Sequence, residues 1–289
     1  MKKSPWHPDT GNAAFMKHFI LPSPPNPEGM IRLYEKDYHY IVRVRRLKPG
    51  MCFDAILPGG EETRIRILST VDNILIGECL KLPGQQSAAR KQAALLPPIM
   101  LFQGLPKGSR MDLIVRQAAE SGVSTVAPFE SEYSAVHLNK DPAAGKTAEK
   151  LKRWEKIVKE ARQQSGSSIE TKVRKPCGFD GLLEYWESVK KEYRQPLGIL
   201  LHQEALEKDP LAKGGLHGYL DKDPGLVALT VGPEGGFSPR EVSLFLAAGF
   251  RPLLMGNTIL RTETAALYGT AAIRTILLES EAWSPRPAE

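Results

Sequence analysis

Apolar and polar positions along the C-terminal two thirds of the chain follow two alternating patterns. Apolar runs of about six residues are typical of buried strands, and stretches with apolar positions three and four apart are typical of amphipathic helices. We expect strands over residues 99–103, 124–129, 197–202, 226–231 and 252–255. We expect helices over residues 109–122, 147–164, 239–248 and 264–279. This order predicts an α/β fold in which a mostly parallel sheet carries helices on both faces.

The first part of the chain follows a period-two pattern instead. Between residues 30 and 82, apolar and polar positions alternate over short segments that are separated by turn signals such as Pro49-Gly50. The pattern predicts strands over residues 39–47, 51–57, 64–68 and 73–82, and therefore a small β-barrel or sandwich. The proline-rich segment 21–29 is compatible with neither a helix nor a central strand.

The composition divides the chain into four parts. Residues 1–15 are expected to form a flexible extension, and residues 16–82 hold the predicted barrel. Residues 83–96 begin with Pro-Gly and carry few strand signals, which is typical of a linker. Residues 97–285 then hold the predicted α/β domain. The length of 289 residues agrees with about two domains.

The overall composition excludes several classes of protein. With 42% apolar and 25% charged residues, the chain is neither wholly disordered nor a collagen or coiled-coil sequence. No apolar stretch approaches the ~20 residues that span a bilayer, and no apolar segment follows the first lysines, which argues against a secretory signal. Three separated cysteines and six histidines show no metal-ligand spacing, so we expect neither a disulfide framework nor a metal site. A reducing cytoplasm is the expected location.

Positive charge is concentrated in two places. The formal net charge is +6, and residues 140–175 contain eleven Lys or Arg against five Asp or Glu, a surplus of six. A second cluster comprises Arg43, Arg45, Arg46 and Lys48. Such clusters favour a polyanionic partner such as nucleic acid. From charge alone, two solvated surfaces explain the clusters equally well.

A glycine-rich loop follows the strand predicted over residues 226–231. Its sequence is Gly232-Pro233-Glu234-Gly235-Gly236, and the next residues, Ser238-Pro239-Arg240-Glu241, have the spacing of a helix capping box. A loop of this kind at the carboxyl end of a parallel strand is typical of a ligand site, because its backbone N–H groups are accessible. The pattern matches neither the dinucleotide fingerprint nor the P-loop. A tight structural turn is the alternative.

A second glycine turn follows the strand predicted over residues 252–255. Gly256 begins it, and the chain then presents Ile259-Leu260-Arg261-Thr262-Glu263 before a helix of small residues. Thr262 has the position of an N-cap, as Ser109 has for the helix over residues 109–122. A surface ion pair between Arg261 and Glu263 fits this pattern as well as a functional role does.

Taken together, the motifs GPEGGFS and LLMGNTILRTETAA resemble the RsmE-type family, the 16S ribosomal RNA uridine N3-methyltransferases of the SPOUT superfamily. HYIVRVRRLKPGM is similar to that family's entry into a PUA-like barrel. PKGSRMDLIVRQAAESGVSTVAPFESEYS and RWEKIVKEARQQSG are similar to its central segments. The resemblance extends over nearly the whole chain from Met16 onward.

The resemblance implies a fold and a set of partners. Residues 97–285 would form a SPOUT methyltransferase domain with a knotted parallel sheet, and residues 16–82 a PUA-like, RNA-binding β-barrel. The cofactor would be S-adenosylmethionine, bound in the knot loops. The partners would be 16S ribosomal RNA or the small ribosomal subunit, and a second copy of the chain packed against the helix over residues 264–279.

The resemblance also implies roles for particular residues. The catalytic pair would be Arg261 and Glu263. The cofactor would be bound by Leu201, Val231, Gly232, Pro233, Glu234, Gly235, Gly236, Leu254, Met255, Gly256, Ile259, Leu260 and Thr264. The RNA would be bound by Arg43, Arg45, Arg46, Lys107 and Arg110. The chain departs from the family at Tyr133 and Ser167, where an arginine is usual, so the RNA contacts or the target, rather than the methyl transfer, would be affected.

The implied reaction needs few catalytic groups. The methyl group of a sulfonium is already electrophilic, so much of the catalysis is positioning. Uridine N3 must lose its proton, and a cation such as Arg261 would stabilise the charge that spreads onto O2 and O4, while Glu263 orients it or assists the proton transfer. N3 lies on the Watson–Crick edge, so the base must be unpaired. A non-catalytic RNA-binding protein of ribosome assembly is the main alternative, and a nucleotide-binding enzyme that uses GPEGG for phosphate is a weaker one.

Overall fold

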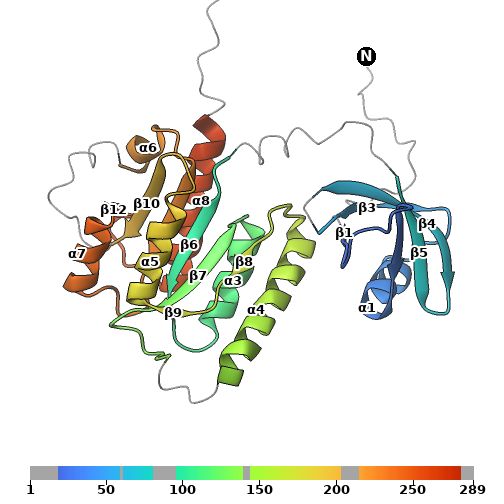
Figure 1. The fold of residues 1–289 in the computed structure, drawn as a ribbon, viewed down its shortest axis with the longest axis horizontal. Helices are drawn as coiled ribbons and strands as arrows, with labels where there is room; N and C mark the ends of the chain where they lie inside the picture. Colours follow the sequence, from blue (N-terminus) through green and yellow to red (C-terminus); the bar gives the residue numbers. More distant parts are fainter. Residues whose placement is uncertain (1–18, 59–60, 81–95, 139–143, 203–214, 281–289) are drawn as a thin grey trace, which may run out of the picture. The chain divides into compact units, whose positions relative to one another are not determined.

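The computed structural model describes residues 19–58, 61–80, 96–138, 144–202 and 215–280 (Figure 1). The contacts divide the chain into two compact units, the first formed largely by residues up to 85 and the second by residues from 86 onward. The expected extension over residues 1–15 and most of the expected linker over residues 83–96 lie outside the described residues.

The first unit is a curled five-stranded sheet (Figure 1). Its strand order is β1-β3-β4-β5-β2. The strands are β1 (Phe19–Ile20), β2 (Met30–Leu33), β3 (Cys52–Ile56), β4 (Glu62–Val71) and β5 (Ile74–Leu80). Strict alternation along β4 buries Ile65 and Ile67 and leaves Arg64 and Arg66 exposed. The buried face collects the core of this unit, and Arg64 pairs across the outer face with Asp54 at 2.7 Å.

The segment predicted as a strand over residues 39–47 is helical instead, so this prediction is wrong. The chain forms helix α1 (Glu35–Tyr38) and a π-helical segment η1 (His39–Val44). Tyr38 and Ile41, three positions apart, are both buried in the core of the first unit, which is the spacing of a helix face rather than of a strand. The strands predicted over residues 51–57, 64–68 and 73–82 are confirmed as β3, β4 and β5.

The second unit is built on a parallel sheet with the order β12-β10-β11-β6-β7-β8, in which β9 also pairs with β7. The strands are β6 (Ile99–Gly104), β7 (Thr125–Glu130), β8 (Lys172–Val173), β9 (Cys177–Gly178), β10 (Pro196–Leu201), β11 (Leu226–Val231) and β12 (Phe250–Leu253). The helices are α3 (Arg110–Glu120), α4 (Ala144–Ser165), α5 (Phe179–Val189), α6 (Gly215–Leu220), α7 (Pro239–Ala247) and α8 (Thr262–Ser280).

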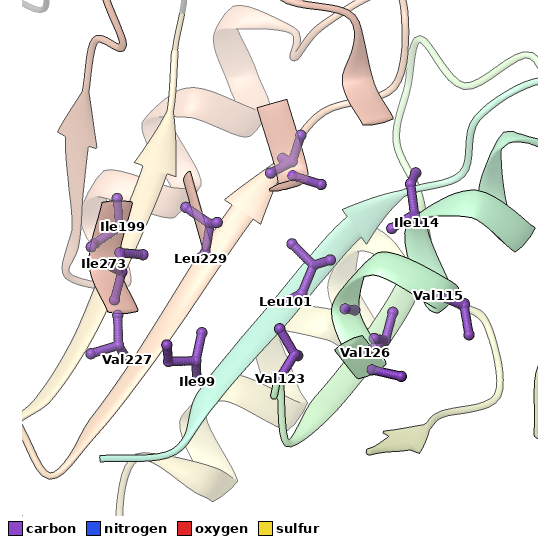
Figure 2. Packing of buried hydrophobic residues seen from close by; sticks show 14 of the residues in the cluster. Ile99, Leu101, Ile114, Val115, Val123, Val126, Ile199, Val227, Leu229 and Ile273 are labelled. Carbon is purple, nitrogen blue, oxygen red and sulfur yellow. The ribbon is translucent and has the colours of Figure 1, made fainter. Parts of the chain in front are cut away.

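Helices cover both faces of this sheet, as the alternating pattern predicted. Ile99 and Leu101 of β6 pack on one face with α3, α4 and α8, and Figure 2 shows their side chains among those of Ile114 and Ile273. The intervening Met100 and Phe102 point to the other face, where they pack with α5 and α7. Every residue of β6 and β11 is buried, which explains why these strands appear in the sequence as continuous apolar runs.

Several boundaries differ from the predicted ones. Helices α5 and α6 were not predicted, and β12 begins and ends two residues before the predicted strand 252–255. Ser109 makes no side-chain capping bond, because its backbone is not extended. Thr262 is the first residue of α8 rather than its cap. The capping box of Ser238 and Glu241 is confirmed. No helix among the described residues is long and apolar enough to cross a membrane.

Candidate functional site

A cavity of about 680 Å³ lies where the chain leaves the carboxyl ends of β10, β11 and β12. The predicted catalytic and cofactor-binding residues that line it are Leu201, Val231, Gly232, Pro233, Glu234, Gly236, Leu254, Met255, Gly256, Ile259, Leu260, Arg261 and Glu263. Gly235 and Thr264 do not line it. The two motif segments meet at one cavity because parallel strands in one sheet end at the same edge.

The first turn, Gly232–Gly236, packs closely on the end of a neighbouring strand because that strand ends in a glycine. A Cβ atom on Gly104, the last residue of β6, would lie 2.5 Å from Pro233 Cδ and 2.7 Å from Pro233 N. Within the turn, the N–H of Gly236 donates to the carbonyl of Pro233 at 3.0 Å, and Gly236 has a φ of +72°. Both glycines are therefore required by the packing and the backbone of this turn.

A buried carboxylate fixes the start of helix α7, which follows the first turn. Glu241 is fully buried and accepts three hydrogen bonds, each 2.9 Å long, from the hydroxyl of Ser131 and from the backbone N–H groups of Glu132 and Ser238. It thereby ties the segment after β7 to the start of α7. On the surface, Arg240 pairs with Glu132 at 2.9 Å, and hydrogen bonds from Ser238 and Arg240 lower the pKa of the Glu132 carboxyl.

Gly235 lies against this tied segment and not against the cavity. A Cβ atom at position 235 would lie 2.8 Å from Tyr133 Cβ and 3.0 Å from Tyr133 O. The glycine thus allows residues 131–134 to pack on the turn, and a larger residue is expected to displace Tyr133. The ring of Tyr133 is half exposed. Its neighbourhood explains the glycine without any contact to a ligand.

The second turn is open to solvent. Gly256 has a φ of +102°, a region that residues with a Cβ rarely adopt. Ile259 is 82% exposed and Leu254 is 44% exposed, although both side chains are apolar. Exposed apolar side chains that line a cavity favour contact with an apolar part of a ligand.

The charged residues pair differently from the sequence-based alternative. Glu263 pairs with Arg110, whose Nε lies 3.7 Å from Glu263 Oε2, so the suggested surface pair between Arg261 and Glu263 is wrong. Arg110 also contacts Glu234, with Nη1 and Oε1 2.8 Å apart. Arg110, expected on an RNA-binding surface, thus lies in the cavity wall between two carboxylates. The Oε2 atom of Glu263 is buried and accepts no hydrogen bond from the described residues.

Arg261 is the unpaired cation of the cavity wall as far as the structure describes the chain. Its side chain is exposed and forms no hydrogen bond or ion pair with a described residue. It is therefore available to a negatively charged group that enters the cavity. This availability distinguishes Arg261 from Arg110, which already contacts two carboxylates.

The remaining predicted RNA-binding residues lie on exposed surface or at its edge. Arg43 and Arg46 in the first unit are exposed, and so is Lys107 in the second. Arg45 is half-buried and lies over the ring of Tyr40, with its Cζ 5.6 Å from the ring centre. The exposed guanidinium groups are free to contact phosphate, whereas that of Arg45 is partly engaged by the aromatic ring.

Sequence reasoning missed several residues of the site. His202, Phe237, Asn257 and Thr258 also line the cavity, and each is adjacent to a predicted residue or lies between two of them. A window of two residues around each motif position would have included them. Gln103 was missed for a different reason, because its only signal is a polar residue inside a buried strand. Among the described residues, no three His, Cys, Asp or Glu side chains are grouped so as to hold a metal ion.

A model of the RNA methyltransferase domain family matches residues 94–274, which is more than half of the chain. This chain belongs to that family. The resemblance suggested by GPEGGFS and LLMGNTILRTETAA is thereby confirmed. The matched residues include β6, β11 and both turns of the cavity.

The similarity to individual proteins extends over most of the chain. The ribosomal RNA small subunit methyltransferase E of Synechocystis is 29% identical over 252 residues, 86% of this chain and 74% of that protein. Its Aquifex aeolicus namesake is 36% identical over 179 residues, 60% of this chain and 67% of that protein. The crystal structure of a Neisseria gonorrhoeae ribosomal RNA small subunit methyltransferase E bound to S-adenosyl methionine has a TM-score of 0.67 at 24% identity, covering 90% of this chain and 98% of that one. This last similarity shows the common fold.

Proposed function

We propose that this protein is an S-adenosylmethionine-dependent methyltransferase that modifies N3 of a uridine in 16S ribosomal RNA. The observation that carries the proposal is the single cavity formed by both motif turns, with an unpaired Arg261 and a largely buried Glu263 in its wall. Membership of the RNA methyltransferase family supports the reaction type. The names of the relatives support ribosomal RNA of the small subunit as the substrate.

The residues of the cavity fit the proposed cofactor. Apolar side chains from Leu201, Val231, Leu254, Ile259 and Leu260 provide a surface for a purine. The two glycine turns expose backbone N–H and C=O groups that can bind the polar edges of the base, the ribose and the methionine moiety. When bound, the cofactor supplies a methyl group on a sulfonium as the electrophile.

Three side chains of the cavity have distinct roles in this proposal. Arg261 stabilises the negative charge that develops on the oxygens of the uracil ring as N3 loses its proton. Glu263 receives that proton on a carboxylate whose Oε2 is not occupied by a hydrogen bond from a described residue. Arg110 acts through Glu263, because it contacts this carboxylate and Glu234 together and so fixes their orientation.

The first unit supplies RNA contacts in this proposal. Residues 16–82 would act as a PUA-like, RNA-binding barrel and residues 97–285 as the SPOUT methyltransferase domain with its knot. The curled sheet with exposed Arg43 and Arg46 supports a role in contacting phosphates. Lys107 lies three positions before the cavity residue Arg110 and would contact the backbone of the same RNA. The target base must be unpaired to expose N3, and the cytoplasm is the expected location.

We further propose that the active form is a homodimer. Helix α8 buries Ala266, Ile273 and Leu277 against its own sheet. It also leaves Leu267 39% exposed and Tyr268 55% exposed. A helix that packs on one side only needs a single apolar stripe, so these exposed apolar side chains outside the buried stripe favour contact with another copy of the chain.

The first test of the proposed function is binding of S-adenosylmethionine, measured by titration calorimetry. Ile259→Asp should weaken binding at least tenfold, because it replaces a cavity-lining apolar contact worth about 1.5–3 kcal/mol by a charge. Ile259 is largely exposed, so the fold should tolerate the change. Val71→Asp, at another largely exposed apolar position, in the first unit, is the matched control and should bind normally. Absence of binding by the wild-type protein would favour the non-catalytic RNA-binding alternative.

The homodimer is tested by light scattering at micromolar concentration. The wild-type protein should have the mass of two chains, and Leu267→Glu should shift it to one chain, because it places a charge in the proposed apolar contact. Leu68→Glu changes a comparably exposed leucine of β4 and should leave the dimer intact. A wild-type protein that scatters as a single chain contradicts the proposal.

A further inference from the structure

A buried chain of hydrogen bonds joins three segments that surround the cavity. The Nε2 atom of Gln103 donates to Thr262 Oγ1 at 2.8 Å, and the hydroxyl of Thr262 donates to the carbonyl of Gly232 at 2.6 Å. Gln103 and Thr262 are 159 positions apart in the sequence, yet both are buried. Gly232 begins the first turn, and Thr262 ends the connection that begins with the second.

Gln103 is anchored in the centre of the sheet. It lies in β6 opposite Val231 of β11, and its Nε2 also donates to the carbonyl of Gly104 at 2.9 Å. Its side chain is fully buried. The amide is therefore held at a fixed place by the most enclosed strands of the second unit, and it can serve as a reference point for the loops above them.

Thr262 lies between Arg261 and Glu263, the two residues proposed to act on the uracil ring. Its hydroxyl oxygen accepts a hydrogen bond from Gln103, and its hydroxyl proton is donated to the carbonyl of Gly232. The hydroxyl therefore acts as donor and acceptor at once. Without this link, the exposed segment from Leu254 to Arg261 has far less to hold it relative to the first turn. Ordering two separate loops during binding lowers affinity, whereas loops that are already fixed avoid this loss.

We propose that Gln103 and Thr262 are positioning residues, whose hydrogen bonds hold the two turns as one preorganised binding site. The identity of the ligand rests on the proposed function, but the link itself does not. The proposal explains why a glutamine is placed in a strand in which every other side chain is apolar or absent. It also assigns the hydroxyl of Thr262 to a connection between loops rather than to capping of α8.

Thr262→Val tests this link, because it keeps the shape of the side chain and removes the hydroxyl. Amide hydrogen exchange in the protein without cofactor should become about tenfold faster in the first turn, residues 232–236, and in the segment that holds the second, residues 254–262, since two buried hydrogen bonds are lost. Affinity for S-adenosylmethionine should fall by about tenfold. Thr262→Ser keeps the hydroxyl and should restore both values.

Thr230→Val is the matched control. Thr230 lies on β11, is fully buried, and its hydroxyl has no hydrogen-bond partner among the described residues. The same chemical change there should leave exchange in both turns and cofactor affinity as in the wild type. Equal effects of the two Thr→Val changes would overturn the proposal, and so would unchanged exchange in Thr262→Val or faster exchange spread over the whole second unit.

Gln103→Met provides an independent variant if Thr262→Val does not fold. It removes both hydrogen bonds that Nε2 donates, to Thr262 and to the carbonyl of Gly104. Only the first belongs to the link between the turns, so exchange in the same two turns should become about threefold to fivefold faster. Exchange in the two turns of the double variant should be no faster than in Thr262→Val alone, because both changes break the same link. Additive effects would overturn the proposal. A wild-type protein that does not bind S-adenosylmethionine would remove the proposed function, while the exchange measurements would still decide on the link.

Discussion

Arg261→Ala is expected to lower the single-turnover methylation rate of 16S ribosomal RNA by about a hundredfold or more. This is the usual loss when one preorganised electrostatic donor to a developing negative charge is removed. Arg261 lines the cavity, and its side chain forms no hydrogen bond or ion pair with a described residue, so truncating that side chain should leave the fold and the affinity for S-adenosylmethionine nearly unchanged. The rate and the melting temperature are to be measured on the same preparation.

Two further variants make the interpretation specific. Arg261→Lys should recover only part of the rate, because a point charge replaces a planar group with five donors. Arg116→Ala removes an exposed arginine of α3 that does not line the cavity, and it should react at the normal rate. A normal rate together with a lower melting temperature for Arg261→Ala would show a structural role and contradict the catalytic one.

The expected effect of Arg261→Ala depends on the ion pair between Glu263 and Arg110, which only the folded chain reveals. In the sequence, Glu263 is the nearest carboxylate to Arg261, and a pair between them is a reasonable interpretation. In the structure, Glu263 pairs with Arg110, from the start of a helix that follows β6. Because β6 lies beside β11 in the sheet, residues far apart in sequence meet at the end of both strands. Spacing along the chain carries no information about such a strand order.

Elements with one strong local signal were predictable. The strands β6, β7, β10 and β11 are continuous apolar runs because both faces of the sheet are covered, and the capping box before α7 is local to four residues. Both glycine turns were therefore placed correctly at strand ends, and residues of both turns line the cavity. Helix α5 carries the same kind of signal, since Phe179, Leu182 and Trp186 have helical spacing and are buried, so it was predictable as well.

Elements that depend on long-range packing were not predictable. Residues 39–47 contain β-branched side chains and alternate in polarity, which favours a strand. Burial of Tyr38 and Ile41 in the core of the first unit favours a helix there and outweighs the local preference. Similarly, Gly235 has the same sequence context as its neighbours in the motif, and only the approach of Tyr133 reveals that it serves packing.

Glu241→Ala is expected to cause the largest loss of stability among the substitutions considered. The buried carboxylate accepts three hydrogen bonds, and its removal leaves the hydroxyl of Ser131 and the N–H groups of Glu132 and Ser238 without their acceptor. Hydrogen bonds to a charged group contribute about 1.5–3 kcal/mol each, and their losses overlap at one site, so we expect the free energy of unfolding of the second unit to fall by about 4 kcal/mol. The melting temperature should fall by roughly 10 °C.

The same substitution at a neighbouring surface glutamate is the control for this loss. The carboxylate of Glu132 lies in the same segment and pairs with Arg240 in solvent, so Glu132→Ala should change the melting temperature only slightly. Because Glu241 also fixes the start of α7 behind the first turn, Glu241→Ala should weaken binding of S-adenosylmethionine even at temperatures where the variant is folded. Calorimetric melting and titration of both variants measure the two effects separately. Equal melting temperatures for the two variants would mean that the three bonds to Glu241 contribute little, and that the loop is held in place by the packing of Pro233 on Gly104 and of Gly235 on Tyr133 instead.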